Sequence, residues 1–373
     1  MLSRRKTSKE KQGGNPAHGI RRTSMSEKIT KSGRRQHATI KEVAELAGVS
    51  QMTVSRVLNR RDVVREATRA RVEDAIRELK YRPNLLARSL AGGSSLFIGM
   101  IFNNPSNSYL SELLIGAMNR CREAGHHLVL EDFSSYQDPS DVDELVGRVS
   151  GAGLDGILVV PPLSEDDLLL SKLEEAGIPC VLIAPKAPPE SGTSLAIDDE
   201  AAAKRMTEYL IARGHTRIGF VIGAEDQISS HRRYSGFQLA MKERGLDIDP
   251  NLIRRGRFTY RSGMEAADKM LDLADQPTAI FASNDDMAAG VIASAFRHGK
   301  RVPEDISVVG YDDTPIASAI WPQLTTVRQP IAEMGYQSVD LLAAFISDDE
   351  AELGELNPIL DVAIIERDSV IKV

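Results

Sequence analysis

Hydrophobic positions follow two different patterns along the chain. Near the N-terminus they recur at the spacing of an α-helix, and one stripe at i, i+3, i+4 and i+7 comprises Val72, Ala75, Ile76 and Leu79. From residue 95 onward, short continuous apolar runs alternate with amphipathic stretches of helical period. The change of pattern predicts a small all-helical module followed by a larger α/β region.

The helical module is predicted to begin with a helix from Ile40 to Ala47. The preceding sequence TIKE predicts a capping box, in which the Thr39 hydroxyl caps the helix and the Glu42 side chain reaches back to it. Gly48 follows, and glycine is typical of the position just past a helix C-terminus.

A second helix is predicted after Ser50, a good N-cap residue, and a third from about Glu66 to Leu79. The inner face of the second helix is expected to carry Val54, Val57 and Leu58. Two helices joined by a tight turn that contains glycine describe a helix-turn-helix. The alternative interpretation is an ordinary helical hairpin with a polar face, which would show the same spacing of apolar residues.

The segment GVSQMTVSRVLN (residues 48–59) has side chains that suit the major groove of DNA, where the second helix of such a motif enters N-terminus first. The short hydroxyl side chains that can reach phosphates are Ser50, Thr53 and Ser55. The longer side chains that can reach base edges are Gln51, Met52 and Arg56.

The α/β region contains seven clear strand-like runs, at residues 95–102, 126–133, 155–161, 179–185, 216–223, 278–285 and 306–313. Continuous apolar strands separated by helices predict a parallel sheet covered on both faces. About ten strand–helix units would exceed one sheet of mononucleotide-binding size, so we expect two doubly wound parallel-sheet lobes. A ligand is expected between the lobes, at the carboxyl ends of the strands.

The composition supports a folded protein of the cytoplasm. Of 373 residues, 42% are hydrophobic, and no apolar run reaches the length of about 18 residues that a membrane span needs. The basic N-terminus is followed by no apolar stretch, which argues against a secretory signal. The chain has two cysteines, Cys121 and Cys180, which are too few for a disulfide framework. We expect both side chains to be buried and to pack as small apolar groups.

Charge is distributed unevenly along the chain. Residues 1–37 carry 11 Lys/Arg and 2 Asp/Glu, whereas the whole chain has a net charge of −7. A basic arm on an acidic body is typical of nucleic-acid-binding proteins. A solvated, disordered tail explains the arm equally well, because it has no aromatic residues and no periodicity.

No pattern in the chain indicates catalysis. GAGLDG (residues 151–156) satisfies G-x-G-x-x-G but precedes a strand instead of following one, and neither a Walker A nor a G-x-S-x-G sequence is present. His126 and His127 would point to opposite faces of a strand, which makes a poor metal site. The acidic clusters Glu165–Asp167 and Asp348–Glu350 are interpreted as helix caps or solvated turns. We therefore expect no enzyme activity, no cofactor and no metal.

Taken together, TIKEVAELAGVSQMTVSRVLN and VREATRARVEDAIRELKYRPNLLARSL resemble the DNA-binding headpiece and hinge of the lactose-repressor/galactose-repressor (LacI/GalR) family. ARGHTRIGFVIG, RRYSGFQLAM, AIFASNDDMAAG, ISVVGYDD and LTTVRQPIAEMG resemble its effector-binding half. The resemblance implies a basic arm (1–37), a headpiece (38–82), a hinge (83–93) and a two-lobed, periplasmic-binding-protein-like domain for effector binding and dimerisation (94–370).

The resemblance also implies roles for residues that contact DNA. Base-reading positions of the family correspond to Gln51, Met52 and Arg56, and phosphate-contacting positions correspond to Thr53, Ser55 and Asn59. In the hinge, Leu90 matches a leucine that wedges into the minor groove, with Asn84, Ala87 and Arg88 beside it. Simple packing at a domain boundary is the other interpretation of Leu90. Two hinges at one operator centre imply a homodimer on a near-palindromic double-stranded operator.

For the small-molecule effector, the resemblance implies contacts from Arg233, Phe258, Asn284, Asp312 and Gln329, with Tyr260 as the alternative aromatic residue. The alternative interpretation is that Asn284 and Asp285 only cap the helix that follows them and that Asp312 or Asp313 only ends a strand. One departure affects the ligand class: where some members have an aspartate, this chain has Ala184, Pro185 and Lys186. A cation in that place argues against a simple neutral galactoside and leaves a carboxylated or phosphorylated sugar, or another glycoside, as the expected ligand.

We therefore expect a transcription regulator that represses carbohydrate-utilisation genes and whose operator affinity is switched by a sugar-like effector. Whether the effector is an inducer or a corepressor is open, because either follows from a difference in affinity between two states. Two rival hypotheses are a solute-binding protein for sugar transport and an enzyme on a doubly wound scaffold.

Overall fold

The computed structural model describes residues 40–59, 65–79, 95–133, 139–189, 192–347 and 357–373. The chain divides into two units, residues 1–87 and 88–373, each of which is considered by itself. The basic arm (1–37), Thr39, the hinge (83–93) and the acidic cluster Asp348–Glu350 lie outside the described residues.

The first unit contains the three predicted helices, α1 (Ile40–Ala47), α2 (Gln51–Asn59) and α3 (Glu66–Glu78). They pack around a small apolar core made by Val43, Ala44, Ala47, Val54, Val57, Val72 and Ala75, with Ile76 and Leu79 packed against it. The predicted inner faces of α2 and α3 are therefore confirmed where their side chains are described.

The turn between α1 and α2 is held by capping interactions. Gly48 has a φ of +63°, which only glycine adopts without strain. The Ser50 hydroxyl accepts a hydrogen bond from the backbone N–H of Thr53 at 3.1 Å, as its predicted capping role requires. Arg71 of α3 donates from Nη2 to the carbonyl oxygen of Ala47 at 2.8 Å. The third helix thus caps the C-terminus of the first.

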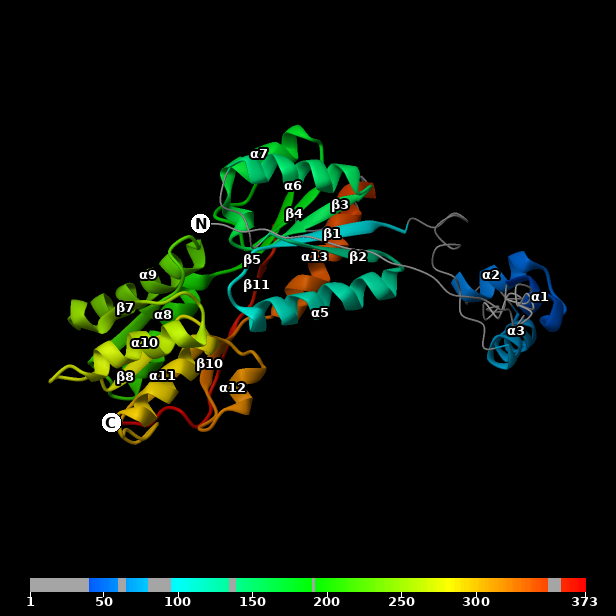
Figure 1. Ribbon diagram of the computed structural model, residues 1–373. Helices are drawn as coiled ribbons and strands as arrows, with labels where there is room; N and C mark the ends of the chain where they lie inside the picture. The colour runs from blue at the N-terminus through cyan, green and yellow to red at the C-terminus, as the bar shows by residue number, and fades with distance from the viewer. Residues whose placement is uncertain (1–39, 60–64, 80–94, 134–138, 190–191, 348–356) are drawn as a thin grey trace, which may run out of the picture. The chain divides into compact units, whose positions relative to one another are not determined.

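The second unit contains two lobes, each built on a six-stranded sheet (Figure 1). In the first lobe the strand order is β11 (Ile359–Leu360), β5 (Thr193–Ile197), β4 (Cys180–Ile183), β3 (Gly156–Val159), β1 (Phe97–Phe102) and β2 (His127–Asp132). One face of the sheet is covered by α5 (Asn107–Ala124) and α13 (Ile331–Ser347). The other is covered by α6 (Pro139–Gly151), the 3₁₀ turn η2 (Leu163–Glu165) and α7 (Asp167–Glu175).

In the second lobe the strand order is β12 (Ala363–Ile365), β10 (Thr325–Arg328), β9 (Ser307–Asp312), β8 (Ala279–Ala282), β6 (Ile218–Ile222) and β7 (Ile253–Arg255). One face is covered by α8 (Asp199–Ala212) and α9 (Ile228–Glu243), and the other by α10 (Tyr260–Leu271) and α11 (Asp285–Arg297). The turn η3 (Pro250–Leu252) precedes β7, and the short helix α12 (Pro315–Ala319) follows β9. The two predicted doubly wound lobes are confirmed, except that β12 runs antiparallel to β10.

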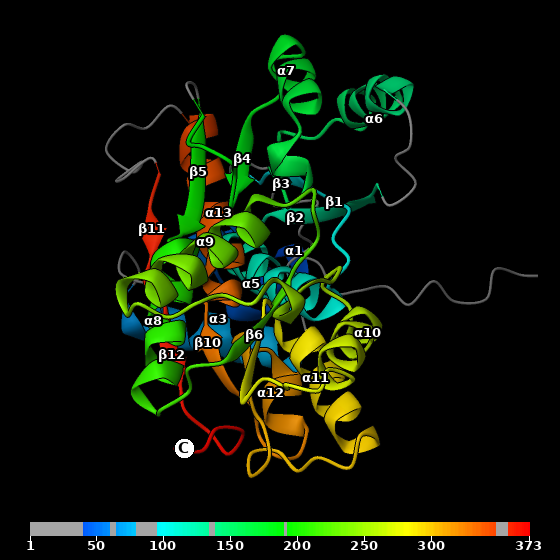
Figure 2. The ribbon, with the colours of Figure 1, turned by 90° about the vertical axis from the view of Figure 1, so that its left-hand side faces the viewer.

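The described chain passes between the lobes in three places, from β5 to α8, from β10 to α13 and from β11 to β12. Figure 2 shows the last of these as the red segment that joins β11 to β12. Each lobe is therefore made from discontinuous parts of the chain. A change in the angle between the lobes has to pass through these three connections.

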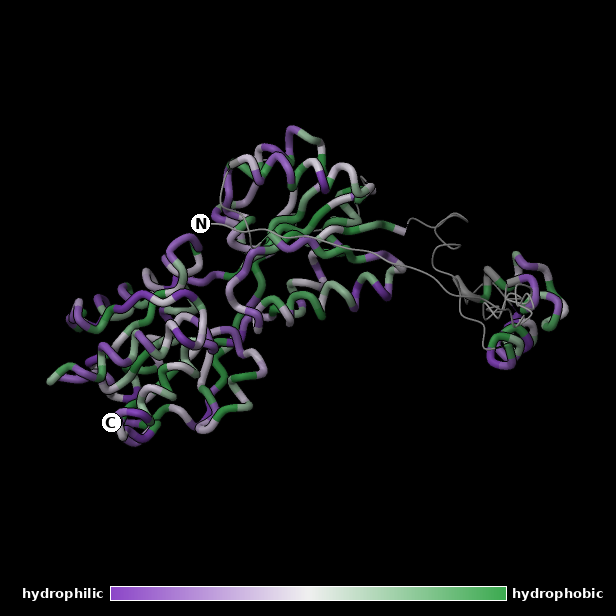
Figure 3. Tube along the Cα trace, viewed as in Figure 1, coloured by the Kyte–Doolittle hydropathy of each residue, from purple (hydrophilic) through white to green (hydrophobic). Residues whose placement is uncertain are grey.

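The core of each lobe is formed by strands that are apolar on both faces, shown in green in Figure 3. In β3 and β8 every residue is buried, as the continuous apolar runs predict. Cys121 is buried and Cys180 partly buried, and both are free thiols. Within the described residues, no helix is both long and apolar enough to cross a membrane.

Glycine allows the helices that cover the sheets to pack in close pairs. A Cβ atom on Gly116 of α5 would lie 1.8 Å from the carbonyl oxygen of Ala332 in α13, and a Cβ atom on Gly335 would lie 2.1 Å from that of Leu113. In the second lobe, Gly290 of α11 meets α10 in the same way. These backbones approach so closely that no side chain fits between them.

We predict that Gly116→Ala lowers the free energy of unfolding by about 1–3 kcal/mol or more, because the added methyl group forces α5 and α13 apart. Gly147→Ala is the matched control, since Gly147 lies in helix α6 with nothing within 4 Å of an added Cβ atom. That substitution should stabilise the protein by roughly 0.5–1 kcal/mol. Denaturant unfolding of both variants checks the prediction, and equal effects would contradict it.

Candidate functional site

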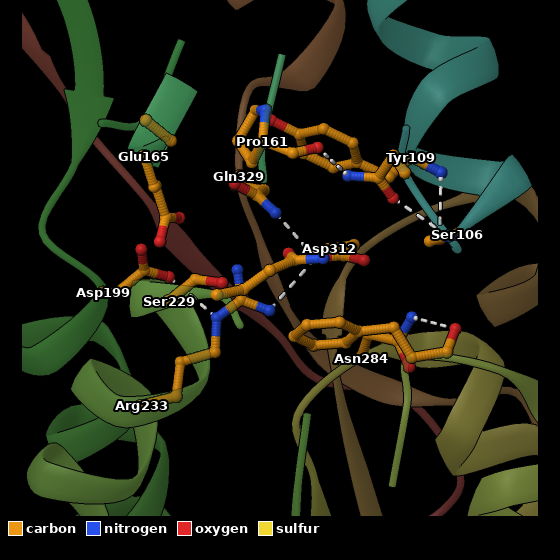
Figure 4. Close-up of a pocket in the computed structure, with 14 residues that line it drawn as sticks. Ser106, Tyr109, Pro161, Glu165, Asp199, Ser229, Arg233, Asn284, Asp312 and Gln329 are labelled. Atoms are coloured by element: carbon orange, nitrogen blue, oxygen red, sulfur yellow. Dashed lines mark hydrogen bonds and ion pairs between the residues drawn. The ribbon is translucent and has the colours of Figure 1, made fainter. Parts of the chain in front are cut away.

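A cleft lies between the two lobes, at the carboxyl ends of the strands, where the sequence predicts a ligand (Figure 4). Its volume is about 450 Å³, including the open mouth. Residues from both lobes line it, namely Asn104, Ser106, Tyr109, Pro161, Glu165, Ala184, Asp199, Gln227, Ser229, Arg233, Phe258, Asn284, Asp312 and Gln329. All five residues predicted to contact the effector are in this set.

Arg233 lies at the base of the cleft and is held by interactions on several sides (Figure 4). Its Nε donates to Asp199 Oδ1 at 2.7 Å, and its Nη1 donates to the carbonyl oxygen of Ser283. Its guanidinium carbon lies 3.7 Å from the centre of the Tyr311 ring, a cation–π contact. The side chain is 7% exposed, so its charge is largely removed from water and its position is fixed.

Asp312 ends strand β9 with a φ of +115°, a value that L-residues rarely adopt. Gln329 donates from Nε2 to Asp312 Oδ1 at 2.6 Å, and Nη1 of Arg233 lies 3.6 Å from the same oxygen. Burial raises the pKa of the Asp312 carboxyl to about 7, although Arg233 and Gln329 act in the opposite direction.

Asn284 and Asp285 have different roles. Asn284 lines the cleft and also caps α11, because its side-chain oxygen accepts from the N–H of Met287 at 2.9 Å. Asp285 is fully buried away from the cleft lining and accepts hydrogen bonds from Thr314 and Thr326. Burial, together with the nearby Asp312, raises the pKa of Asp285 well above its ordinary range. The capping interpretation therefore holds for Asn284 without excluding it from the cleft.

Phe258, and not Tyr260, is the aromatic residue of the second lobe that lines the cleft. Phe258 is buried, with its ring centre 5.8 Å from the guanidinium carbon of Arg233. Tyr260 begins α10 and is 45% exposed. Nδ2 of Asn284 donates to the carbonyl oxygen of Phe258 at 3.1 Å, which holds the backbone of this residue.

The expected cation beside Ala184 is not in the cleft. Ala184 lines the cavity, but the Lys186 side chain is 62% exposed and its Nζ lies 3.8 Å from Asp167. Among the described residues that line the cleft, Arg233 is the only cationic side chain. The suggestion that Lys186 replaces the aspartate of some family members is therefore wrong, because its side chain turns outward to a surface carboxylate.

The sequence interpretation missed two carboxylates of the cleft. Asp199, at the start of α8, is the partner of Arg233; the acidic pair that directly follows strand β5 could have indicated it. Glu165 was expected to cap a helix or lie in a solvated turn, which is wrong, because it lines the cavity. Its neighbour Asp166 does cap α7 by accepting from the N–H groups of Leu168 and Leu169.

Hydrogen bonds join the two lobes at the rim of the cleft. Ser106 and Ser108, at the start of α5, donate to the two carboxylate oxygens of Asp286 in α11, each at 2.9 Å. On the other side, Nη2 of Arg232 in α9 donates to the carbonyl oxygen of Lys186 at 2.7 Å. Contacts of this kind depend on the angle between the lobes.

The predicted DNA-contacting residues lie on or beside α2 of the first unit where they are described. Gln51 is exposed, Met52 is 64% exposed, and Thr53 is half-buried. Ser50 is exposed and caps the helix. Ser55, Arg56 and Asn59 belong to α2, but the structure does not describe their side chains. The hinge positions Asn84, Ala87, Arg88 and Leu90 lie outside the described residues.

Two family models match this chain. Residues 39–84 match the bacterial regulatory proteins of the lacI family, and residues 207–370 match a periplasmic binding protein-like domain. The first match covers the helical module, and the second covers most of the second lobe together with α13. No group of three or more His, Cys, Asp or Glu side chains that could hold a metal occurs in the described part of the chain.

Several characterised proteins are similar over nearly their whole length. The HTH-type transcriptional repressor PurR of Vibrio atlanticus is 36% identical over 337 residues, which cover 89% of this chain and 98% of the relative. The ribose operon repressor of Escherichia coli K12 is 36% identical, over 87% of this chain and 98% of the relative.

Solved structures show the same similarity. A transcriptional regulator CelR–cellobiose complex aligns with a TM-score of 0.67 and 32% identity, over 89% of this chain and 100% of that one. The lac repressor dimer bound to operator and the anti-inducer ONPF aligns with a TM-score of 0.68 and 29% identity, over 90% and 100%.

We predict that Asp312→Asn changes the pH dependence of stability. Because the pKa of Asp312 is raised to about 7, the folded protein binds this proton more tightly than the unfolded chain does. The resulting stabilisation is complete below about pH 4 and is lost as the pH rises to 7, an effect on the order of a few kcal/mol. The melting temperature of the variant, relative to wild type, should therefore rise between pH 5 and pH 8.

Once Asp312 and the nearby Asp285, whose pKa Asp312 raises, are both ionised, the difference between the two melting temperatures should be constant, which separates the titration from the lost contacts to Arg233 and Gln329. A difference that is the same at every pH would contradict the prediction.

Proposed function

The chain belongs to the lacI family of bacterial regulatory proteins, and from this premise we propose that it represses carbohydrate-utilisation genes under the control of a sugar-like effector. The observation that carries the proposal is the combination in one chain of a helix-turn-helix module and a polar cleft between two lobes. Relatives of this chain are transcriptional repressors, a class of protein without enzymatic activity.

The helix-turn-helix is the proposed DNA-reading element. We propose that Gln51, Met52 and Arg56 contact base edges in the major groove. Phosphates would be contacted by Ser50, Thr53, Ser55 and Asn59. This is supported by the exposure of Gln51 and Met52 at the start of α2, where Val54 and Val57 are buried.

The division into a basic arm (1–37), headpiece (38–82), hinge (83–93) and two-lobed domain (94–370) is proposed together with this assignment. Leu90 is the proposed minor-groove wedge, accompanied by Asn84, Ala87 and Arg88. A related structure is a repressor dimer bound to operator, which supports a homodimer on a near-palindromic site. A repressor acts on the chromosome, so we propose that this protein works in the cytoplasm.

The cleft is the proposed effector site, with contacts from Arg233, Phe258, Asn284, Asp312 and Gln329. Carboxylate and amide groups can bind the hydroxyls of a sugar, and the ring of Phe258 can cover its C–H face. Structures similar to this chain contain cellobiose and ribose, which supports a carbohydrate ligand.

The effector can act on DNA binding through the angle between the lobes. A ligand that contacts both walls of the cleft favours one lobe angle over another, and the three inter-lobe connections transmit the difference. Transport is the weaker alternative, because a solute-binding protein has no use for a helix-turn-helix.

We predict that Arg56→Ala weakens binding to the operator by roughly 1–3 kcal/mol while binding to random DNA falls much less, because a bidentate base contact discriminates by that amount. The operator is first selected from random duplexes, and affinities are then measured by fluorescence anisotropy at constant salt. Arg77→Ala, an exposed arginine of α3, is the control and should leave selectivity unchanged. Equal weakening on all DNA would contradict a base-reading role for Arg56.

We predict that Asp312→Asn abolishes the response to sugar and leaves operator affinity in the absence of sugar within about twofold, since the cleft and the DNA reader are in separate units. Operator binding is titrated with and without the sugar that switches the wild-type protein. A normal response of the variant would show that the effector binds elsewhere.

A further inference from the structure

Glu165 occupies an unusual position in the cleft. It ends η2 in the first lobe, and its Oε2 accepts a hydrogen bond from the backbone N–H of Ile228, the first residue of α9 in the second lobe, at 2.7 Å. Its other oxygen, Oε1, is buried and has no hydrogen-bond partner. A buried acceptor without a partner costs free energy, and in a ligand site it indicates a place for a donor.

The surroundings of Glu165 offer a second unpartnered group. Gln227, the residue before α9, is 4% exposed and lines the same cleft, and its Nε2 has no partner. In contrast, Arg233 is already bound to Asp199 and to Ser283. Figure 4 shows the Glu165 carboxylate pointing into the cleft towards Asp199 and Ser229. Glu165 therefore presents a free acceptor and Gln227 a free donor in the same cleft, and hydroxyl groups of a ligand can satisfy both kinds of group.

The balance of charge in the cleft limits the ligand. Three carboxylates line it, Glu165, Asp199 and Asp312, against the single guanidinium of Arg233. An anionic ligand would be repelled by whichever of these carboxyls are ionised, and two of the five N–H groups of Arg233 already donate to Asp199 and Ser283. A neutral ligand rich in hydroxyls meets no such repulsion. Burial also raises the pKa of the Glu165 carboxyl to about 7, consistent with its shortage of compensating partners.

We propose that Glu165 is an effector-binding and specificity-determining residue, whose Oε1 accepts a hydrogen bond from a hydroxyl of a neutral polyhydroxylated effector. The inference rests on the proposed function and deepens it. Glu165 supplies, from η2, the acceptor that Ala184 at the end of β4 cannot provide. Because the other oxygen of the same carboxylate binds α9, the side chain links the effector to both lobes.

The experiment uses the full chain and a panel of neutral pentoses, hexoses and disaccharides that includes D-ribose and cellobiose. The phosphorylated counterpart of each sugar that binds is tested beside it by calorimetry. The wild-type protein should bind a neutral sugar at least tenfold more tightly than its phosphorylated counterpart. This comparison needs no variant.

Glu165→Gln keeps the shape of the side chain but replaces one acceptor by a donor. Measured at a pH well above 7, where the Glu165 carboxyl is ionised, it should weaken binding of the neutral sugar roughly 10- to 100-fold, the loss expected for a hydrogen bond to a charged group. Asp167→Asn is the matched control, because it removes a carboxylate two residues away whose side chain is 87% exposed. The control should bind the sugar as the wild type does, and both variants should keep the wild-type circular dichroism spectrum.

The proposal is overturned if no neutral sugar of the panel binds, if a phosphorylated sugar binds more tightly than its neutral form, or if Glu165→Gln binds within threefold of wild type. Operator selection is measured on the same preparations without sugar. If the protein selects no operator, the proposed function is overturned. If it selects an operator but does not show the expected sugar selectivity, only the role of Glu165 is overturned.

Discussion

The buried ion pair between Arg233 and Asp199 is the interaction on which the cleft depends. Asp199 lies where the chain crosses from β5 into α8, and Arg233 projects from the neighbouring α9, so the pair joins the helices that form one wall. Neither charge is stable in this position without the other, because burial of a single ion costs several kcal/mol. The pair also fixes the guanidinium beside Asp312, and through Asp312 the side chain of Gln329 at the second crossing.

Packing within each lobe is tighter than the contacts between the lobes. Within each lobe, paired helices approach so closely at glycine that their backbones are in contact, and neither helix can slide without a clash. Between the lobes, contact is made by hydrogen bonds such as those of Ser106 and Ser108 to Asp286. Such bonds can be exchanged for water at low cost. We therefore expect each lobe to keep its own packing if the angle between the lobes changes, and a ligand that bridges them to favour one angle.

The carboxyl groups of the described cleft lining outnumber its cations, and this affects which class of ligand the cleft can bind. A site built for a phosphate or a carboxylate presents free cationic groups or helix N-terminal amides. Here the one guanidinium of the described lining already donates to Asp199 and Ser283, and one amide at the start of α9 is bound by Glu165. The surface that remains is rich in acceptors and includes an aromatic ring, an arrangement suited to the hydroxyls and the C–H face of a sugar.

The sequence by itself determined the local elements. The cap at Ser50, the turn at Gly48 and the stripe from Val72 to Leu79 specify the helical module, and continuous apolar runs specify the parallel strands. The family resemblance, which is read from the sequence, named five expected effector contacts, and all five line the cleft. The tertiary structure alone decided where Glu165 and Lys186 point: Glu165 faces a residue 63 positions away, and Lys186 a surface carboxylate. Side-chain direction in a loop depends on such distant partners, and no local pattern encodes them.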